Sequence, residues 1–288
     1  MPDLPHGVTP TKDPGGREAF LVRGKGGTAL VATLGAQVLS WTTAGGEVLW
    51  CGSKAEYAAG KPVRGGIPLV FPWFGDHPTD KKLPAHGFVR NLPWRVTATG
   101  PGPRLVLTIG DDASTRAMWP HAFLLTCTIT ITDGLRIELA IDNPGTSPVR
   151  CEEALHTYFA VGDIRSTSVH GLQGVAFSEH AAAPEGPWDH KAPLQFRAET
   201  DRIFQGTPDR LELHAPALRR TITLHSEKAR SAIVWNPWPA KTARLSGLAA
   251  DDWQRFCCIE TANVREHGIE LAAGGRHTLV LELRRCDG

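Results

Sequence analysis

Alternation of apolar and polar side chains is the feature that most constrains how this chain can fold. Residues 135–142 read LRIELAID, and side chains two apart on an extended strand share a face, so one face of this segment is apolar. The preceding run, 123–131, is rich in Leu, Thr and Ile, and Asp133-Gly134 joins the two. Because Asp-Gly favours a tight hairpin turn, the pattern predicts two antiparallel strands. Further strand signals occur at 29–34, 37–41, 105–109, 211–213, 221–225, 232–235, 256–260 and 278–283.

Helical periodicity is nearly absent. Only 114–118 and 248–255 could form a turn or two of helix, which argues against strands alternating with helices around a parallel sheet. The 30 Gly and 22 Pro are spread along the chain, supplying many turns but marking no flexible linker. We therefore expect an all-β protein: a large antiparallel β-sandwich in one domain over residues 1–288, with residues 1–16 as a segment that could be flexible.

The charge balance excludes several classes of partner. Lys and Arg total 31 and Asp and Glu total 30, a formal net charge of +1. Neither a nucleic acid nor a membrane surface is therefore expected to bind through bulk electrostatics. No stretch approaches the roughly 20 apolar residues that span a bilayer, and the N-terminus lacks the apolar run of a signal peptide. We expect a soluble, cytoplasmic protein.

The cysteines and histidines form no recognisable metal or disulfide pattern. The twelve histidines contain no HExxH, and the six cysteines have no CxxC spacing. Reduced thiols in a reducing compartment are the simpler interpretation. We expect neither a metal nor an organic cofactor. The cysteines are Cys51, Cys127, Cys151, Cys257, Cys258 and Cys286.

Two ionisable residues, His156 in EEALHTYF and Glu260 in CCIET, lie in segments that otherwise have the pattern of buried strands. Burying an imidazole or a carboxylate is costly unless the group is paired, hydrogen-bonded or used. On a strand, His156 shares its face with Ala154 and Tyr158, which would suit the wall of a polar cavity. An acid and a base facing one cavity are what proton transfer on a small polar substrate requires.

Each of the two residues also has a plainer explanation. His156 could be a core histidine whose ring bonds to a backbone carbonyl, an alternative of about equal weight given the polar groups around it. Glu260 could be a strand-end carboxylate that reaches solvent, which is the commoner fate of glutamate. Held in a partly dry pocket instead, Glu260 would have a raised pKa and could act as a base.

The stretch 51–94 has little periodicity and carries RGGIPLVFPWFG and PAHGFVR. Long loops of this kind are more often functional than idle. Arg64 precedes two glycines and Arg90 closes the second motif, and an arginine fork suits phosphate oxygens. Taken singly, each arginine is more simply a surface residue beside a turn. His86 could contact a ligand or fix the loop, and neither loop matches a nucleotide-binding fingerprint.

Two further positions could meet a sugar. Asp201, in ETDRIF, could accept hydrogen bonds from sugar hydroxyls, although alone it is more simply a turn or salt-bridge residue. Trp235, in VWNPW, could stack on a sugar ring, but a buried core tryptophan would have the same pattern and is the safer interpretation.

Taken together, the motifs resemble those of the glucose-6-phosphate 1-epimerase (hexose-6-phosphate mutarotase) branch of the aldose 1-epimerase superfamily. No single motif is decisive, but their order along residues 64–264 is specific. The matching segments are RGGIPLVFPWFG, AHGFVRNLPW, EEALHTYFAVGDI, ETDRIF, VWNPW and FCCIETANV.

The resemblance implies a galactose-mutarotase-like β-supersandwich with its site in a cleft on one sheet. It implies that His156 is the general acid and Glu260 the general base. Arg64, Arg90 and Asp201 match substrate-binding positions, with both arginines directed to the phosphate. His86 matches a position lining the site. Residue 85 is Ala, where relatives can carry a Gln that contacts substrate, so substrate affinity or preference could differ here.

The expected activity is interconversion of the α and β anomers of an aldohexose 6-phosphate. One alternative is an epimerase of free aldoses, which needs no cationic clamp. Another is a non-catalytic carbohydrate-binding protein on the same fold, which retention of His156 and Glu260 argues against. A glycosidase fits less well, because its usual chemistry needs two carboxylates. The expected partner is a small sugar phosphate, and without heptads or a long exposed apolar helix the expected state is a monomer.

Overall fold

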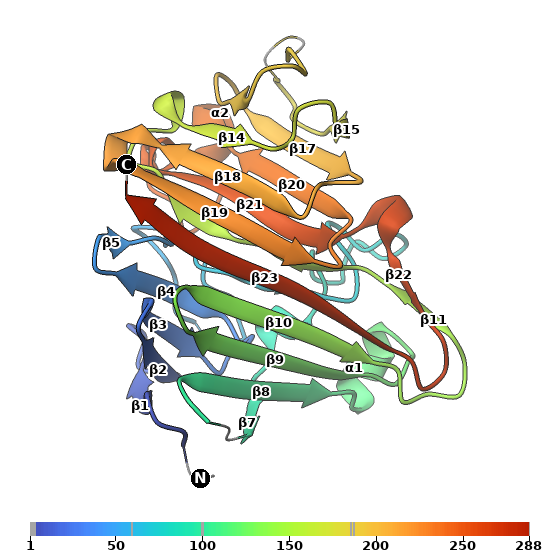
Figure 1. The fold of residues 1–288 in the computed structure, drawn as a ribbon. Coiled ribbons are helices and arrows are strands. Elements are labelled where there is room, and N and C mark those ends of the chain that lie inside the picture. The colour runs from blue at the N-terminus through green and yellow to red at the C-terminus, as the bar shows by residue number, and fades with distance from the viewer. Residues whose placement is uncertain (1–3, 59, 99–100, 185, 187, 288) are drawn as a thin grey trace.

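The alternating segments form strands in the computed structural model, which describes residues 4–58, 60–98, 101–184, 186 and 188–287. The predicted hairpin is confirmed: β9 (Leu124–Ile131) and β10 (Leu135–Asp142) pair antiparallel with Ile131 opposite Leu135. The last strand, β23 (Arg276–Asp287), pairs with the other edge of β10. Figure 1 shows β23 crossing the middle of the sheet that these strands build.

Within the described part of the chain, this sheet has nine strands, and a second sheet has seven. In spatial order the nine are β16 (Leu194–Gln195), β14 (Ser168–His170), β18 (Arg210–Ala215), β19 (Arg220–Glu227), β23, β10, β9, β8 (Arg104–Gly110) and β7 (Arg95–Ala98). The seven are β15 (Ala176–Glu179), β17 (Thr200–Gln205), β20 (Ser231–Asn236), β21 (Phe256–Asn263), β12 (Glu153–Leu155), β6 (Leu69–Val70) and β13 (Tyr158–Ala160), which pairs with β21.

Two smaller sheets complete the β structure of the described residues. The five-stranded sheet joins β1 (Val8–Lys12), β2 (Glu18–Gly24), β3 (Gly27–Ala32), β4 (Val38–Thr43) and β5 (Gly46–Glu47). The two-stranded one joins β11 (Val149–Cys151) and β22 (Ile269–Leu271). All pairings between these named strands are antiparallel, as the sequence predicted. Residues 8–12, inside the segment expected to be flexible, form β1.

Helices are short, and one of them was not foreseen. The prediction at 114–118 is confirmed by α1 (Ala113–Met118), which begins with a capping box at Asp112. The segment 248–255 forms only the 3-10 turn η4 (Asp252–Gln254), whereas the unpredicted α2 (Trp238–Thr242) lies just before it. The other 3-10 turns are η1 (Val89–Asn91), η2 (Ile164–Ser166), η3 (Pro216–Leu218) and η5 (Arg265–His267). No helix among the described residues is long and apolar enough to cross a membrane.

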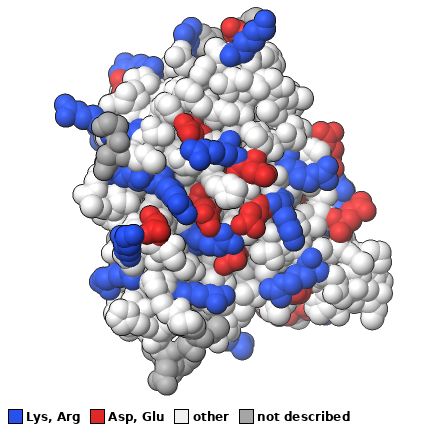
Figure 2. Space-filling view, in the orientation of Figure 1, with Lys and Arg blue, Asp and Glu red and all other residues white. Residues whose placement is uncertain are grey.

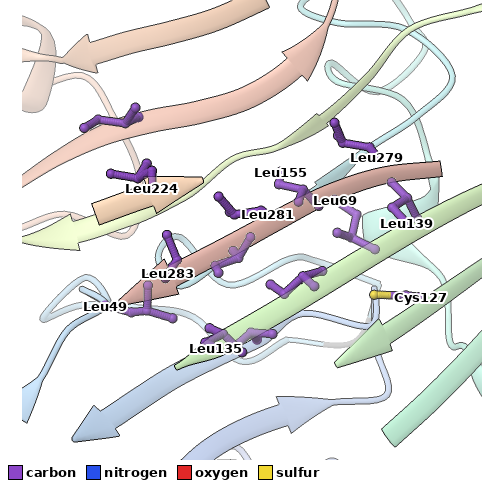
Figure 3. Packing of buried hydrophobic residues seen from close by; sticks show 14 of the residues in the cluster. Leu49, Leu69, Cys127, Leu135, Leu139, Leu155, Leu224, Leu279, Leu281 and Leu283 are labelled. Atoms are coloured by element: carbon purple, nitrogen blue, oxygen red, sulfur yellow. The ribbon is translucent and has the colours of Figure 1, made fainter. Parts of the chain in front are cut away.

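The main core lies between the nine-stranded and seven-stranded sheets. Alternate side chains of β10 and β23, among them Leu135, Leu139 and Leu281, join one buried cluster with Leu69 and Leu155 of the other sheet. Figure 3 shows these leucines converging between the two sheets. Because side chains two apart share a face, the period-two pattern of the sequence directly selects which residues enter this core.

The outward side chains of the nine-stranded sheet carry mixed charge. Arg136 forms ion pairs with Glu138, Glu227 and Glu282 on β10, β19 and β23. Figure 2 shows basic and acidic residues interspersed over the face that it presents. This face therefore has no extended patch of one sign, in keeping with the balanced composition.

We predict that Leu281→Ala lowers the free energy of unfolding by about 2–5 kcal/mol, because Leu281 is fully buried between the sheets and truncation leaves a cavity. Leu124→Ala is the matched control: Leu124 is 42% exposed, and its loss should change stability by less than about 0.5 kcal/mol. Urea denaturation followed by circular dichroism measures both. Equal losses for the two variants would contradict this placement of the core.

Candidate active site

All six residues singled out from the sequence line one cavity of about 480 Å³. It opens on the face of the seven-stranded sheet opposite the main core. Strands β17, β20 and β21 supply part of its lining, and the loop that contains residues 62–90 supplies another part. The six are Arg64, His86, Arg90, His156, Asp201 and Glu260. The structure therefore brings these distant positions together at one cavity, while their roles toward a substrate stay predictions.

Glu260 projects into the cavity because of its register on β21. Cys257 and Ile259 join the main core, while Cys258 and Ala262 join a second apolar cluster on the other face, which is the face of Glu260. The strand was expected to end at residue 260, but β21 continues to Asn263, so Glu260 lies mid-strand. The strand-end, solvent-reaching alternative is wrong, since Glu260 is only 2% exposed.

His156 lies on the same face, between β12 and β13. Its backbone N–H donates to the Pro68 carbonyl at 3.0 Å, which ties the segment to the neighbouring loop. The imidazole stacks on the Tyr158 ring at 4.8 Å between centroids. Its Nδ1 is buried without a hydrogen-bond partner among the described residues. The alternative of a core histidine satisfied by a carbonyl is therefore not what the structure has.

The two side chains meet on the cavity floor, where Nε2 of His156 lies 3.4 Å from Oε1 of Glu260. Burial, reinforced by the positive charge of Arg90, holds the pKa of His156 well below 6.5. Burial, with the Asp201 carboxylate, raises the pKa of Glu260 well above 4.5, and Arg90 opposes that rise. Both directions have one physical cause: a dry floor disfavours charge on either group. Burial therefore favours the neutral imidazole and the protonated carboxyl.

His86 is held by an unusual loop. Its backbone φ is +62°, and the following Gly87, at +73°, passes so close to Phe71 that a Cβ there would lie 1.8 Å from the Phe71 carbonyl oxygen. The Gly75 N–H donates to His86 Nδ1 at 3.4 Å, leaving Nε2 to carry the ring proton. Burial, followed by the charge of Arg90, lowers the pKa of His86 to about 3. His86 is thus a neutral donor in the cavity wall.

The two predicted arginines are half-buried in the cavity wall. Arg64 donates from Nε to the Ser246 carbonyl at 2.8 Å, and Arg90 donates from Nη2 to the Ala85 carbonyl at 2.8 Å. Nε of Arg90 is buried without a partner among the described residues. Burial lowers the pKa of Arg90, yet a guanidinium keeps its charge at neutral pH. Both forks therefore retain free donors for an anion.

Asp201, on β17, forms a salt bridge, which was the simpler alternative drawn from the sequence, and it also lines the cavity. Lys241 of α2 lies 3.1 Å from its Oδ2 and 3.0 Å from Oε1 of Glu199, a carboxylate that is 6% exposed. The buried Glu199 carboxylate needs a positive partner, and Lys241 supplies that charge beside Asp201. The ion pair fixes Asp201 in the cavity lining, where its carboxylate can accept from sugar hydroxyls.

Sequence reasoning missed two basic residues of the lining, Lys241 and Arg265. Lys241 lies three positions after VWNPW and Arg265 directly follows FCCIETANV, which was the only available signal. Trp235 is both things the sequence allowed: it packs in the second apolar cluster and also lines the cavity. No group of three His, Cys, Asp or Glu side chains that could hold a metal ion occurs among the described residues.

Comparisons with known proteins agree with this fold. The crystal structure of "a putative mutarotase (YeaD)" from Salmonella typhimurium superposes with a TM-score of 0.89 at 28% identity, covering 100% of this chain and 96% of that one. A galactose mutarotase-like protein from Lactobacillus casei gives 0.75 at 18% identity, covering 93% of this chain and 100% of that one. The fold is therefore the galactose-mutarotase-like β-sandwich that the sequence predicted.

The sequence comparisons identify the family. The Aldose 1-epimerase family matches residues 19–284, and the chain belongs to it. An Escherichia coli K12 protein named "Putative glucose-6-phosphate 1-epimerase" is 34% identical over 242 residues, which are 83% of this chain and 80% of that protein. A protein of the same name from Cenchrus ciliaris is 29% identical over 277 residues, 91% of this chain and 83% of that protein.

We predict that His86 makes stability depend on pH below neutrality. The unfolded chain protonates this histidine near pH 6.5, whereas the folded protein keeps it neutral down to about 3. Between these values the unfolded state binds one more proton, so its relative free energy falls as pH falls, by up to about 1.4 kcal/mol per pH unit. His86→Asn, which tolerates the left-handed backbone, should flatten the curve of unfolding free energy against pH by that slope.

The control is His225→Asn, because His225 is exposed on β19 and should leave the slope unchanged. Urea titrations at pH 4 to 7 measure both variants. A His86→Asn curve parallel to that of the wild type would show that the folded protein does protonate His86 in this range.

Proposed function

We propose that the protein interconverts the α and β anomers of an aldohexose 6-phosphate, with glucose 6-phosphate as the first substrate to test. The observation that carries the proposal is the 3.4 Å contact between Nε2 of His156 and Oε1 of Glu260 on the floor of a cavity walled by arginines. Membership of the aldose 1-epimerase family and the names of its relatives support the same activity.

The proposed reaction needs only an acid and a base. Glu260 removes the proton from the C1 hydroxyl while protonated His156 donates a proton to the ring oxygen. The bond between C1 and the ring oxygen breaks, and the open-chain aldehyde forms. Rotation about C1–C2 presents the other carbonyl face, and the reverse proton transfers close the ring as the other anomer. Each well-placed group contributes about 10²–10⁴-fold to such a rate.

The electrostatics of the floor explain how one pair can serve both roles. In the free cavity, burial favours neutral His156 and protonated Glu260. Imidazolium and carboxylate together hold the same single proton, so the working form arises when that proton passes from Glu260 to His156 across their contact. Arg90 and Arg64 oppose the imidazolium. A bound phosphate would offset their charge and favour the ionised pair.

The proposed preference for a sugar phosphate over a free sugar rests on two arginines of the cavity wall. Arg64 and Arg90 make no ion pair with a carboxylate among the described residues, and their free donors match phosphate geometry. An epimerase of free aldoses would share the His–Glu chemistry but would gain nothing from two such cations. Asp201, held by Lys241, offers the acceptor that sugar hydroxyls need in either case.

We predict that His156→Asn and Glu260→Gln each reduce anomerisation of glucose 6-phosphate by at least about 10²-fold, because each removes one partner of the proton exchange. NMR exchange between the two anomers measures the rate, corrected for the spontaneous reaction. Glu266→Gln is the control, since Glu266 is an exposed carboxylate near the end of β21 that does not line the cavity. Wild-type rates in either site variant would refute the assignment of roles.

A further prediction separates sugar phosphates from free sugars. Arg64→Ala and Arg90→Ala should each lower kcat/KM for glucose 6-phosphate by about 10- to 100-fold, the worth of a charged hydrogen bond, while the value for glucose changes little. The same NMR exchange measurement, made on glucose 6-phosphate and on glucose, gives both values for each variant. Equal losses on the two would favour an epimerase of free aldoses.

A further inference from the structure

Among the described residues, four Lys and Arg side chains line the cavity, and they differ in whether a carboxylate pairs with them. Lys241 lies within 3.1 Å of two carboxylates, those of Glu199 and Asp201. Arg64, Arg90 and Arg265 form no ion pair among the described residues; their hydrogen bonds go to backbone carbonyls. Three unneutralised guanidinium groups around one cavity repel one another, which is a cost that an anionic ligand would remove.

The third arginine, Arg265, is firmly placed although it is exposed. Its guanidinium carbon lies 5.5 Å from the centre of the Phe74 ring, and Nη1 donates to the Phe74 carbonyl at 3.4 Å. The Glu152 carboxylate accepts from the backbone N–H of both Phe74, at 2.7 Å, and Arg265, at 2.5 Å. Arg150 donates to the Arg265 carbonyl at 2.6 Å. These contacts fix the backbone on both sides of the side chain.

Arg265 and Arg90 lie along one wall of the cavity. The Phe74 ring, against which Arg265 packs, makes an edge contact with His86 at 4.9 Å between ring centres. Arg90 donates to the carbonyl of Ala85, the residue before His86. Ala85 has no polar side chain, so the donors of this wall come from the histidine and the two arginines. The charges of all three arginines reach His86, since each lowers its pKa.

The exposure of the lining side chains increases from the floor of the cavity to its mouth. Glu260 and His156 are 2% and 7% exposed, Arg64 and Arg90 are half-buried, and Arg265 is exposed. A hexose 6-phosphate carries its reacting carbon and its phosphate at opposite ends. With C1 and the ring oxygen at the floor, the phosphate would extend towards the mouth.

We propose that Arg265 joins Arg64 and Arg90 in a three-arginine seat that binds the phosphate of the substrate at the cavity mouth. The inference rests on the proposed function and deepens it: it assigns a specificity-determining role to a residue outside the resemblance motifs. A phosphate monoester dianion offers three oxygens, and three guanidinium forks can each meet it with paired donors. Lys241 is no part of this seat, because its charge is taken up by Glu199 and Asp201.

The test compares Arg265→Gln and Arg265→Lys with the wild type on glucose 6-phosphate and on glucose. Because Arg265 is exposed, Arg265→Gln should raise KM for glucose 6-phosphate by about 3- to 30-fold with kcat little changed, and leave glucose unaffected. Arg265→Lys keeps the charge without the planar fork and should fall between. The difference in KM for glucose 6-phosphate between Arg265→Gln and the wild type should shrink at about 1 M NaCl, where charges are screened within about 3 Å.

Arg276→Gln is the matched control, because Arg276 is exposed, pairs with Asp142 and does not line the cavity. Its KM for glucose 6-phosphate should equal that of the wild type. A merely structural Arg265 would affect both sugars alike and would be insensitive to salt. Equal effects on the two sugars, or an unchanged KM in Arg265→Gln, would overturn the proposal.

Binding of inorganic phosphate, followed by tryptophan fluorescence, separates this inference from the proposed function. If the wild type binds phosphate but does not turn over glucose 6-phosphate, the anomerase proposal fails while the seat is still under test. In that case a 3- to 30-fold weaker phosphate affinity of Arg265→Gln supports the seat. An affinity equal to that of the wild type rejects it.

Discussion

The contact between His156 and Glu260 is the interaction on which the rest of the site depends. It exists because β21 pairs with β20 on one edge and with β12 and β13 on the other. This pairing sets Glu260 opposite Ile233 and brings the break between β12 and β13, which carries His156, beside it. A slip of one residue in β21 would turn Glu260 into the main core and Ile259 into the cavity. Register is thus a chemical constraint as well as a structural one.

Burial gives the pair its chemistry. On a wet surface, a histidine and a glutamate would hold their ordinary pKa values and would form a weak ion pair. On the dry floor both charged forms are disfavoured, so burial favours neutral His156 beside protonated Glu260, and the charge of a bound ligand would be needed to shift that proton to His156. Such a pair can give a proton to one atom and take one from its neighbour, as opening of a sugar ring requires.

The charges of the lining residues also differ from one part of the cavity to another. Its floor carries the His156–Glu260 pair, one side carries Asp201 paired with Lys241, and the wall and mouth carry arginines that have no carboxylate partner in the described part of the chain. The surface shown in Figure 2 has no comparable concentration of one charge. The positive charge of the cavity would orient a substrate that is anionic at one end, and the balanced composition of the chain gives no bulk attraction for polyanions.

The sequence by itself determined the strands, their faces and most of the site. Period-two alternation predicted the β9–β10 hairpin and the face of His156, because the pleat enforces that period everywhere. The motifs predicted Arg64, His86, Arg90 and Asp201, all of which line the cavity. Only the tertiary structure decided which neighbours these groups meet. The Lys241–Glu199 pair and the stacking of Arg265 on Phe74 join segments far apart in the chain. Local pattern carries no information about such contacts, since they depend on how the loops pack across the sheet.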